Sequence, residues 1–444
     1  MQRTLFDKVW DAHVVEELPG GNALVFVDLV VAHEITTPQG AIAIEREFED
    51  RLYDPKRIVA MNDHVSPAKD TATAIQAQVV RTWAKRHGIV LHDIGDNGIC
   101  HVIVPERGYV TPGMTVCCGD SHTCTLGAFG AFALGIGTTA QAGAMLAGCL
   151  VLQRPKVMRI EVTGELRADA TAKDLALAVI ANIGFRGGTG YVLEYTGSAI
   201  RALTMEQRMT LCNMAIEAGA TTGMIAADET TMAYLAGTQQ SPFGYAMQRA
   251  DPGAQYDATV TIDASAVRPT VTWGTNPGES TAIDGIVPFD ASPTSLAYMD
   301  LQPGQAMTGI ALDQAFIGSC TNARISDLRA AAEVMRGRRV SVPTIVTPGS
   351  QAVRRQAERE GLHDIFQDAG ALWTHSSCGP CLGMSMGVLA PGARCISSSN
   401  RNFPGRMGDG GRVHLASPVV VAASAIAGRI ASPLEIATRE AVPA

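Results

Sequence analysis

The chain has no excess of basic residues and no apolar leader, and each absence excludes a class of function. Its 444 residues contain 35 Lys and Arg against 43 Asp and Glu, a net charge of −8. A nucleic-acid-binding face needs clustered positive charge, so we expect no nucleic-acid partner. The first twenty residues carry charges throughout. We therefore expect no secretory signal and a cytoplasmic location.

Long charged, repeated or low-complexity runs are also missing, and strand-like and helix-like patterns alternate along the chain instead. This alternation is typical of α/β proteins with largely parallel sheets. Turn-rich segments at 154–155 and 276–286 divide the chain into predicted α/β domains at 1–157, 158–285 and 286–444. Expected strands cover 23–35, 159–166, 258–265 and 270–274, and expected helices cover 71–88, 174–184, 207–220 and 327–339, the last with Ser326 as its N-cap.

One uncharged stretch, from Thr123 to Gln153, raises the question of a membrane span. Six glycines and several polar residues interrupt it, which suits closely packed helices and turns. We therefore expect no membrane-spanning segment. Its segment G-I-G-T-T-A, 135–140, formally matches a dinucleotide-binding fingerprint, but we expect no strand before it and favour small-residue packing.

The ten cysteines lack the spacing of a secreted disulfide framework, so most should be buried thiols. In S-S-C-G-P-C-L-G, Cys378 and Cys381 form a C-x-x-C pair, which suits half a zinc site, a redox dithiol or an iron–sulfur cluster. Zinc would need a second such pair, and the sequence contains none. The C-G-P-C sequence is also that of a thioredoxin-type thiol pair. A thiol–disulfide oxidoreductase that uses these two cysteines is therefore the alternative from a different class.

A third cysteine favours the cluster. Cys320 lies in F-I-G-S-C-T-N-A-R, a loop of small polar residues before an expected helix. Gly318 and Ser319 allow the backbone to approach a bulky inorganic group, whose sulfides nearby N–H groups can bind. Taken alone, such a cysteine is more often a buried thiol in a tight turn.

Arginines gather in the segment 397–414, which is too rich in Gly, Ser and Asn for a charged helix face. It contains Arg401, Arg406 and Arg412. The planar guanidinium binds carboxylates through two parallel hydrogen bonds, so this loop indicates a clamp for a small polycarboxylate. A surface loop with incidental arginines is the alternative.

Three histidines stand in segments that suit proton transfer. A carboxylate beside an imidazole fixes its tautomer and raises its basicity. Any one such histidine is more often structural, but three beside a cluster favour catalysis. The residues are Asp63–His64 in N-D-H-V-S-P, His101 in G-I-C-H-V, and Asp120, Ser121 and His122 in G-D-S-H-T.

Together these segments resemble the aconitase superfamily, and within it the branch of bacterial 3-isopropylmalate dehydratase large subunits. The likeness covers nearly the whole chain and is far more specific than any single motif. It implies the aconitase-type fold, three α/β domains around a central cluster, without the C-terminal swivelling domain. The segments that carry it are 5–15, 31–40, 111–139, 187–195, 212–220, 228–231, 271–278, 316–334 and 399–406.

The resemblance implies a cofactor and its ligands. Cys320, Cys378 and Cys381 would hold one [4Fe–4S] cluster, in which one iron has no protein ligand. An open iron suits a Lewis acid rather than an electron carrier. The hydroxyl and one carboxylate of the substrate would bind there.

The resemblance also implies the remaining site residues. His64 would give a proton to the departing hydroxyl. The carboxylate–imidazole pairs would be Asp63 with His64, Asp120 with His101, and Glu194 with His122, while Ser121, Asn400, Arg401 and Arg406 would bind the substrate.

In aconitases a serine on the swivelling domain, beside an arginine, removes the carbon-bound proton. This chain ends at Ala444, soon after the last expected helix, so the resemblance implies a separate small subunit that supplies both residues. The implied reaction isomerises 2- and 3-hydroxy acids by dehydration and rehydration, with 3-isopropylmalate of leucine biosynthesis as the first candidate substrate. The C-G-P-C sequence differs from the C-S-M-C of that branch. Homoaconitate, a methylated malate and a citrate analogue are therefore alternative substrates.

Overall fold

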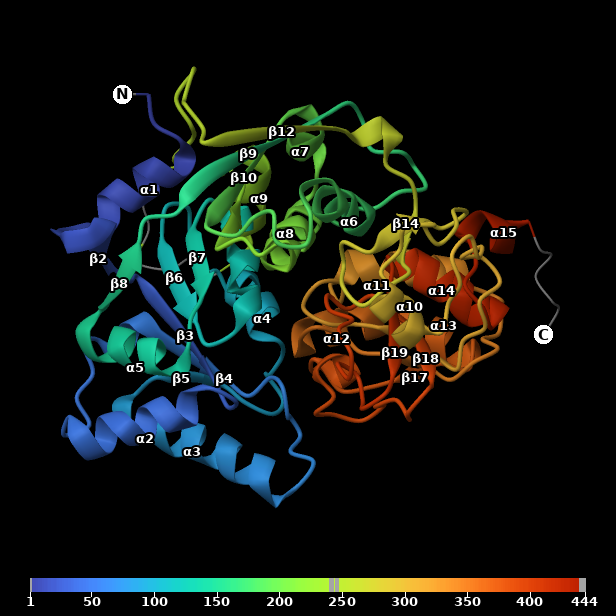
Figure 1. The fold of residues 1–444 in the computed structure, drawn as a ribbon. Helices are drawn as coiled ribbons and strands as arrows, with labels where there is room; N and C mark the ends of the chain where they lie inside the picture. The colour runs from blue at the N-terminus through green and yellow to red at the C-terminus, as the bar shows by residue number, and fades with distance from the viewer. Residues whose placement is uncertain (1, 239–242, 244–246, 439–444) are drawn as a thin grey trace. The chain divides into compact units, whose positions relative to one another are not determined.

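The computed structural model describes residues 2–238, 243 and 247–438 (Figure 1). The chain forms two compact units. The first comprises Met1–Gly164 and Arg186–Ile262, and the second Glu165–Phe185 and Asp263–Ala444. The segment 158–285 contributes to both units, and the division into three domains stays a prediction.

The first unit is built on a five-stranded parallel sheet in the order β5-β4-β3-β6-β7. Every residue of β3, β4 and β6 is buried, as expected of parallel strands that are covered on both faces. Helices α2, α3 and α5 pack together along one side of this sheet (Figure 1). The bounds are β3 (Leu29–His33), β4 (Ile58–Met61), β5 (Val90–His92), β6 (Thr115–Cys118), β7 (Phe132–Gly135), α1 (Leu5–His13), α2 (Thr37–Glu47), α3 (Thr71–His87), α4 (Cys100–Glu106) and α5 (Thr138–Ala147).

Two further sheets complete the first unit. One is antiparallel, in the order β1-β2-β8, and the other has the order β11-β10-β9-β12. The bounds are β1 (Val14–Leu18), β2 (Asn22–Phe26), β8 (Cys149–Gln153), β9 (Lys156–Thr163), β10 (Tyr191–Thr196), β11 (Thr222–Met224), β12 (Ala258–Asp263), α7 (Ser198–Ala202), α8 (Met205–Asn213) and α9 (Glu229–Ala236), with 3-10 helices η3 (Ser121–Phe129) and η4 (Met214–Ala218).

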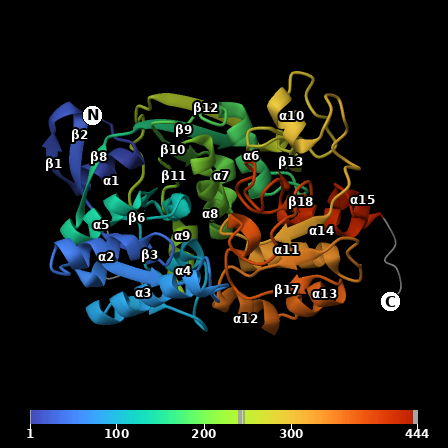
Figure 2. The ribbon, with the colours of Figure 1, turned by 60° about the horizontal axis from the view of Figure 1, so that its bottom comes forward.

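The second unit contains another five-stranded parallel sheet, in the order β17-β16-β15-β18-β19, and an antiparallel pair β13-β14. Helices α11 and α14 lie side by side (Figure 1, Figure 2). The bounds are β13 (Thr270–Thr272), β14 (Ser280–Ala282), β15 (Gln314–Ile317), β16 (Thr344–Val346), β17 (Leu372–Trp373), β18 (Arg394–Ser397), β19 (Arg412–Leu415), α6 (Ala172–Ile183), α10 (Pro293–Met299), α11 (Ile325–Met335), α12 (Gln351–Arg359), α13 (Leu362–Asp368), α14 (Pro418–Ala427) and α15 (Pro433–Ala437), with the 3-10 helix η6 (Gly379–Leu382).

Both parallel sheets share one strand order. The chain enters at the central strand, builds outward on one side and then returns to build the other side. The order therefore reverses between β3 and β6 in the first unit and between β15 and β18 in the second. Loops that leave the carboxyl ends of two such strands diverge, and the crevice between them is where ligands bind in open α/β sheets.

The expected alternation of strands and helices is confirmed, and three local expectations need correction. The expected helix at 207–220 ends as α8 at Asn213 and continues as η4. Arg324, not Ser326, is the N-cap of α11, because the Asp327 carboxylate accepts the Arg324 N–H at 3.1 Å. A strand, β7, does lead into 135–140.

Small-residue packing still accounts for that segment. A Cβ on Gly135 would lie 2.6 Å from the Asp120 carbonyl oxygen, so the strand end needs glycine to pass the neighbouring loop. In the described part of the chain, no helix is long and apolar enough to cross a bilayer.

Close packing of η3 on β11 gives a first prediction. A Cβ on Gly127 would lie 1.8 Å from the Gly223 carbonyl oxygen, a backbone atom that cannot move aside cheaply. We expect Gly127→Ala to lower the free energy of unfolding in urea by about 2–3 kcal/mol. Gly143→Ala is the matched control, because nothing lies within 4 Å of that position in α5. It should raise stability by about 0.5–1 kcal/mol. Equal urea midpoints for Gly127→Ala and wild type would contradict this packing.

Candidate active site

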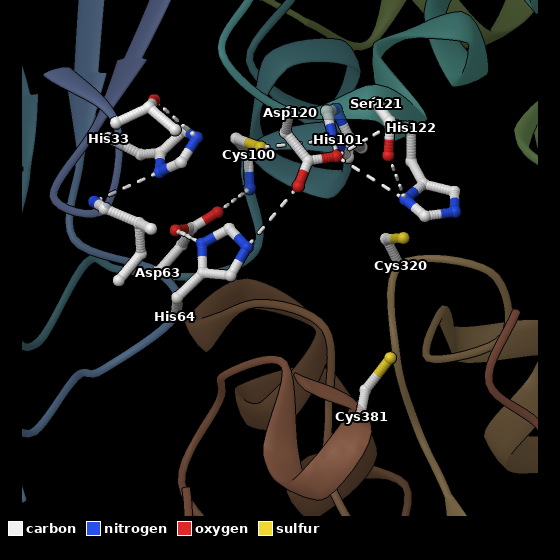
Figure 3. Close-up of polar contacts among 12 residues, drawn as sticks. His33, Asp63, His64, Cys100, His101, Asp120, Ser121, His122, Cys320 and Cys381 are labelled. Atoms are coloured by element: carbon white, nitrogen blue, oxygen red, sulfur yellow. Dashed lines mark hydrogen bonds and ion pairs between the residues drawn. The ribbon is translucent and has the colours of Figure 1, made fainter. Parts of the chain in front are cut away.

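Histidines and carboxylates of the first unit gather where its central strands end. His33 is the last residue of β3, Asp63 and His64 follow β4, and Asp120 follows β6. Because carboxyl ends of parallel strands meet at one edge of a sheet, these side chains come together (Figure 3). The rings of His33 and His64 stack with their centroids 4.7 Å apart.

Asp63 holds His64 in one orientation. Its carboxylate bonds His64 Nδ1 and also accepts the Cys100 backbone N–H at 3.0 Å. Burial opposes the charged form of Asp63, but attraction to His64 outweighs it and keeps the pKa of this carboxyl well below its ordinary value. An ionised carboxylate on Nδ1 leaves Nε2 as the working nitrogen of the ring. That nitrogen lies 3.5 Å from Asp120 Oδ2 (Figure 3).

Asp120 joins the three sequence-predicted histidines. Its carboxylate lies 2.8 Å from His101 Nε2 and accepts the His122 backbone N–H at 2.7 Å. Burial raises the pKa of Asp120, but hydrogen bonds from His101, His122 and His64 overcome this effect and hold it well below its usual range. The expected pairs Asp63–His64 and Asp120–His101 therefore exist as geometry. Ser121 also lies here, with its Oγ 3.5 Å from His122 Nδ1.

The expected pairing of His122 with Glu194 is wrong. His122 Nε2 lies 2.9 Å from Glu217 Oε1, and both side chains are buried. Helix α8 packs along η3, where Asn213 Nδ2 donates to Thr125 Oγ1 at 2.8 Å. Glu217 stands about one turn after Asn213, so it meets the residue about one turn before Thr125.

Glu194 has a different set of contacts. From β10 its carboxylate accepts the Tyr256 hydroxyl at 2.8 Å and the Leu5 and Phe6 backbone N–H groups at 3.1 and 3.5 Å. Burial raises the pKa of Glu194, against the effect of these donors. A carboxylate at the first turn of α1 satisfies free N–H groups and the positive end of the helix dipole. Its contacts are those of a residue that docks α1.

Glu34 is a second acid that sequence reasoning did not single out. It is fully buried, and its two oxygens accept the backbone N–H groups of Asp63, His64 and Val65 at 3.1, 2.7 and 2.7 Å. It therefore sets the path of the loop that carries His64. Both missed acids lie beside apolar residues. Glu34 directly follows β3, and Glu217 lies within η4. A single acid next to apolar residues was the signal that the sequence offered, because acidic side chains are rarely buried without a partner.

In the second unit, the predicted cysteines follow two strands of the other parallel sheet, the central strand β15 and the edge strand β17. Cys320 stands three residues after β15, and Cys378 and Cys381 follow β17. All three side chains are buried. Ser319 Oγ lies 3.9 Å from Cys320 Sγ and 3.4 Å from Cys381 Sγ, so both sulfurs share one neighbour. Cys378 immediately precedes η6, which contains Cys381.

The loop after β18 reaches the same two sulfurs. Asn400 Nδ2 donates to Cys320 Sγ at 3.2 Å, and Asn400 Oδ1 lies 3.7 Å from Cys381 Sγ. Arg406 Nη2 lies 3.7 Å from Cys381 Sγ, and Arg401 follows Asn400 directly. Arg412 is not part of this group, because it belongs to β19 and donates to the Tyr298 carbonyl at 3.0 Å. Its inclusion in the carboxylate clamp was wrong.

Two glycines and one strained residue suit these loops to a bulky group. Cβ atoms on Gly318 and Gly379 would lie 2.5 and 2.8 Å from Cζ of the same buried Phe316 ring. Ser319 has φ of +78°, a left-handed conformation that costs a non-glycine residue about 1–3 kcal/mol. Buried thiols, backbone that packs without side chains, and donors beside the sulfurs together fit an iron–sulfur cluster.

Comparison with known proteins agrees with this chemistry. The model of the aconitase family (aconitate hydratase) matches residues 7–428. The chain belongs to the aconitase family. A 3-isopropylmalate dehydratase large subunit from Roseiflexus castenholzii is 46% identical, over 98% of this chain and 99% of the relative. The protein of the same name from Anaeromyxobacter dehalogenans is 45% identical, over 98% and 97%.

Among solved structures, the holo-form of aconitase X from Thermococcus kodakaraensis covers 85% of this chain and 84% of its own. Its TM-score is 0.49 at 13% sequence identity. This likeness carries no argument about the site.

The contacts of Glu34 generate a prediction about the His64 loop. We expect Glu34→Ala to speed hydrogen exchange of the backbone amides of residues 63–65 by about 10- to 100-fold, since hydrogen bonds to a buried carboxylate are lost. Glu45→Ala is the control, because that carboxylate is exposed and pairs with Arg86. It should leave exchange at these amides unchanged. Protected amides in Glu34→Ala would show that the loop is held by other contacts.

Proposed function

We propose that this chain is the large subunit of a [4Fe–4S]-dependent hydro-lyase, with 3-isopropylmalate as its first candidate substrate. The observation that carries the proposal is the approach of Asn400 and Ser319 to both Cys320 and Cys381. Two buried thiols that share polar neighbours at the end of a parallel sheet suit a cluster better than isolated structural cysteines. The names of the relatives support the choice of substrate.

Cys320, Cys378 and Cys381 would hold the cluster. When bound, the cluster supplies a Lewis acid with one iron free for the hydroxyl and a carboxylate of the substrate. Asn400 and Ser319 would orient the thiolates, as groups around a metal site orient its ligands. Arg401 and Arg406 would bind the substrate carboxylates through their planar guanidinium groups, and Ser121 would add a polar contact.

His64 would donate the proton that the departing hydroxyl needs. Asp63 keeps the proton on Nδ1, so that the proton on Nε2 is the one available for transfer. Asp120 lies beside His64 Nε2 and also bonds His101. This carboxylate can therefore pass a proton between the two imidazoles. We assign the remaining carboxylate–imidazole pair to His122 and Glu217.

A small subunit would complete the enzyme. Both relatives are named large subunits, which supports a partner of this kind. We propose that it supplies the swivelling domain, with the serine that removes the carbon-bound proton and the arginine beside it. The C-G-P-C sequence keeps homoaconitate, a methylated malate and a citrate analogue as competing substrates.

The ligand assignment predicts the colour and iron content of the protein. Anaerobically purified protein should be brown and should bleach in air. Cys320→Ser should lose bound iron and dehydratase activity together, because a three-cysteine site cannot hold the cluster with two thiolates. Cys395→Ser is the control, since this buried cysteine lies within β18 and donates to its own strand. A colourless wild-type protein with a titratable Cys378–Cys381 dithiol would instead support a thiol–disulfide oxidoreductase.

Substrate choice is tested by co-expressing the chain with its small subunit. The complex should be assayed anaerobically on 3-isopropylmalate, homocitrate, citrate and citramalate, with the large chain alone as the inactive control. We expect turnover of 3-isopropylmalate at the highest kcat/KM. Exclusive turnover of another acid would overturn the substrate and leave the reaction class standing.

The partner of His122 is tested by two carboxamide variants in the same complex. Glu217→Gln should lower kcat by about 10²–10⁴-fold, the usual size of an acid–base contribution. Glu194→Gln should lower thermal stability through the weakened docking of α1 and keep kcat close to the wild-type value. The reverse result would return the catalytic role to Glu194.

A further inference from the structure

A buried lysine stands behind the loop that carries Asn400 and Arg401. Lys173 is the second residue of α6, and its side chain has no exposed surface. Its ammonium Nζ donates to the carbonyl oxygens of Ser398, at 3.2 Å, and of Ser399. These carbonyls belong to the two residues that directly precede Asn400.

The position of this lysine is costly, which argues for a specific role. A charged ammonium loses its hydration when it is buried. It also stands in the first turn of a helix, where the dipole repels positive charge. The neighbouring Asp174 carboxylate binds elsewhere, at 2.7–2.8 Å from Thr171 and at 2.8 Å from the Thr270 backbone N–H. An apolar residue would serve a purely packing role at lower cost.

The loop that Lys173 contacts is held on its other sides too. The Ser398 hydroxyl accepts the Gly318 N–H at 2.9 Å, which ties this loop to the segment before Cys320. Asn402 Nδ2 donates to the Gly274 carbonyl at 2.7 Å, and this fixes the end of the loop beyond Arg401. Lys173 holds the start of the loop, at the carbonyl oxygens of Ser398 and Ser399. The contacts of the Ser398 hydroxyl and of Asn402 do not involve these oxygens.

We propose that Lys173 is a positioning residue that holds the backbone of Ser398 and Ser399, so that Asn400 stays on Cys320 and Cys381 and Arg401 is presented to a substrate carboxylate. The proposal deepens the proposed function, because it assigns a support to the same loop. The ammonium acts through the backbone carbonyls of Ser398 and Ser399. Loss of its contacts should affect substrate binding and the surroundings of the sulfurs more than the fold.

The test compares Lys173→Met and Lys173→Gln, in the large chain alone and in the complex with the small subunit. In the chain alone, Lys173→Met should speed hydrogen exchange at residues 398–402 selectively. In the complex, it should lower kcat/KM for 3-isopropylmalate by about 10- to 100-fold, the usual loss of activity when a support of a metal site is removed, and most of this loss should be a rise in KM. The electron paramagnetic resonance signal of the oxidised cluster should also shift. Lys173→Gln should fall between Lys173→Met and wild type, because its amide can donate to one carbonyl.

Arg208→Met is the matched control. Arg208 is another fully buried cation, in the first unit. It donates to the carbonyls of Leu203 and Arg201 at 3.1 and 3.0 Å and also pairs with the Asp228 carboxylate at 2.7 Å. It should lower stability and leave both the exchange at 398–402 and KM unchanged.

Wild-type exchange, KM and cluster signal in Lys173→Met would overturn the proposal, as would faster exchange spread evenly through the second unit. If Lys173→Met does not fold, Lys173→Gln decides by the same measurements. Wild-type protein without iron or activity would reject the proposed function instead, and the exchange experiment would still test Lys173.

Discussion

Loops that leave the carboxyl ends of β3, β6, β15 and β18 have to diverge, because the strand order of each parallel sheet reverses there. This constraint places the polar residues of the chain. Short strands buried on both faces can carry few charges, so ionisable groups stand just beyond the strand ends. His64 and Asp120 occupy such positions in the first unit, and Cys320 and Asn400 occupy them in the second.

Burial at those edges makes each ionisable group depend on its partner. For Asp63 and Asp120, attraction to neighbouring imidazoles outweighs the loss of hydration and lowers the pKa of each carboxyl. Three backbone N–H groups offset the cost of burying the Glu34 carboxylate, and two carbonyl oxygens do the same for the Lys173 ammonium. Glu34 and Lys173 bind the backbone of the loops that carry His64 and Asn400, and in this way they orient those two side chains.

Much of this arrangement can be predicted from the sequence, because the patterns that indicate it lie within short segments of the chain. The alternation of apolar strands and amphipathic helices indicated the α/β class, and the spacing of Cys320, Cys378 and Cys381 indicated a cluster among other options. Adjacent residues such as Asp63 and His64 were paired correctly. Because these two residues are consecutive in the chain, their side chains are held close together whatever the rest of the fold does.

The sequence patterns did not predict which side chains of distant segments pair, as for His122 and Glu217. Glu194 and Glu217 are both acids of the first unit, and only the packing of α8 on η3 brings Glu217 to His122. Composition and motif spacing indicated the fold class and the pairing of Asp63 with His64, because these follow from neighbours in the chain. The ligand role of Cys320, Cys378 and Cys381 stays a prediction. Tertiary structure alone decided that Glu194 docks α1, that Arg412 lies in a strand and that Lys173 contacts the Asn400 loop. Each of these depends on which faces of two remote elements meet, and one-dimensional patterns do not record that.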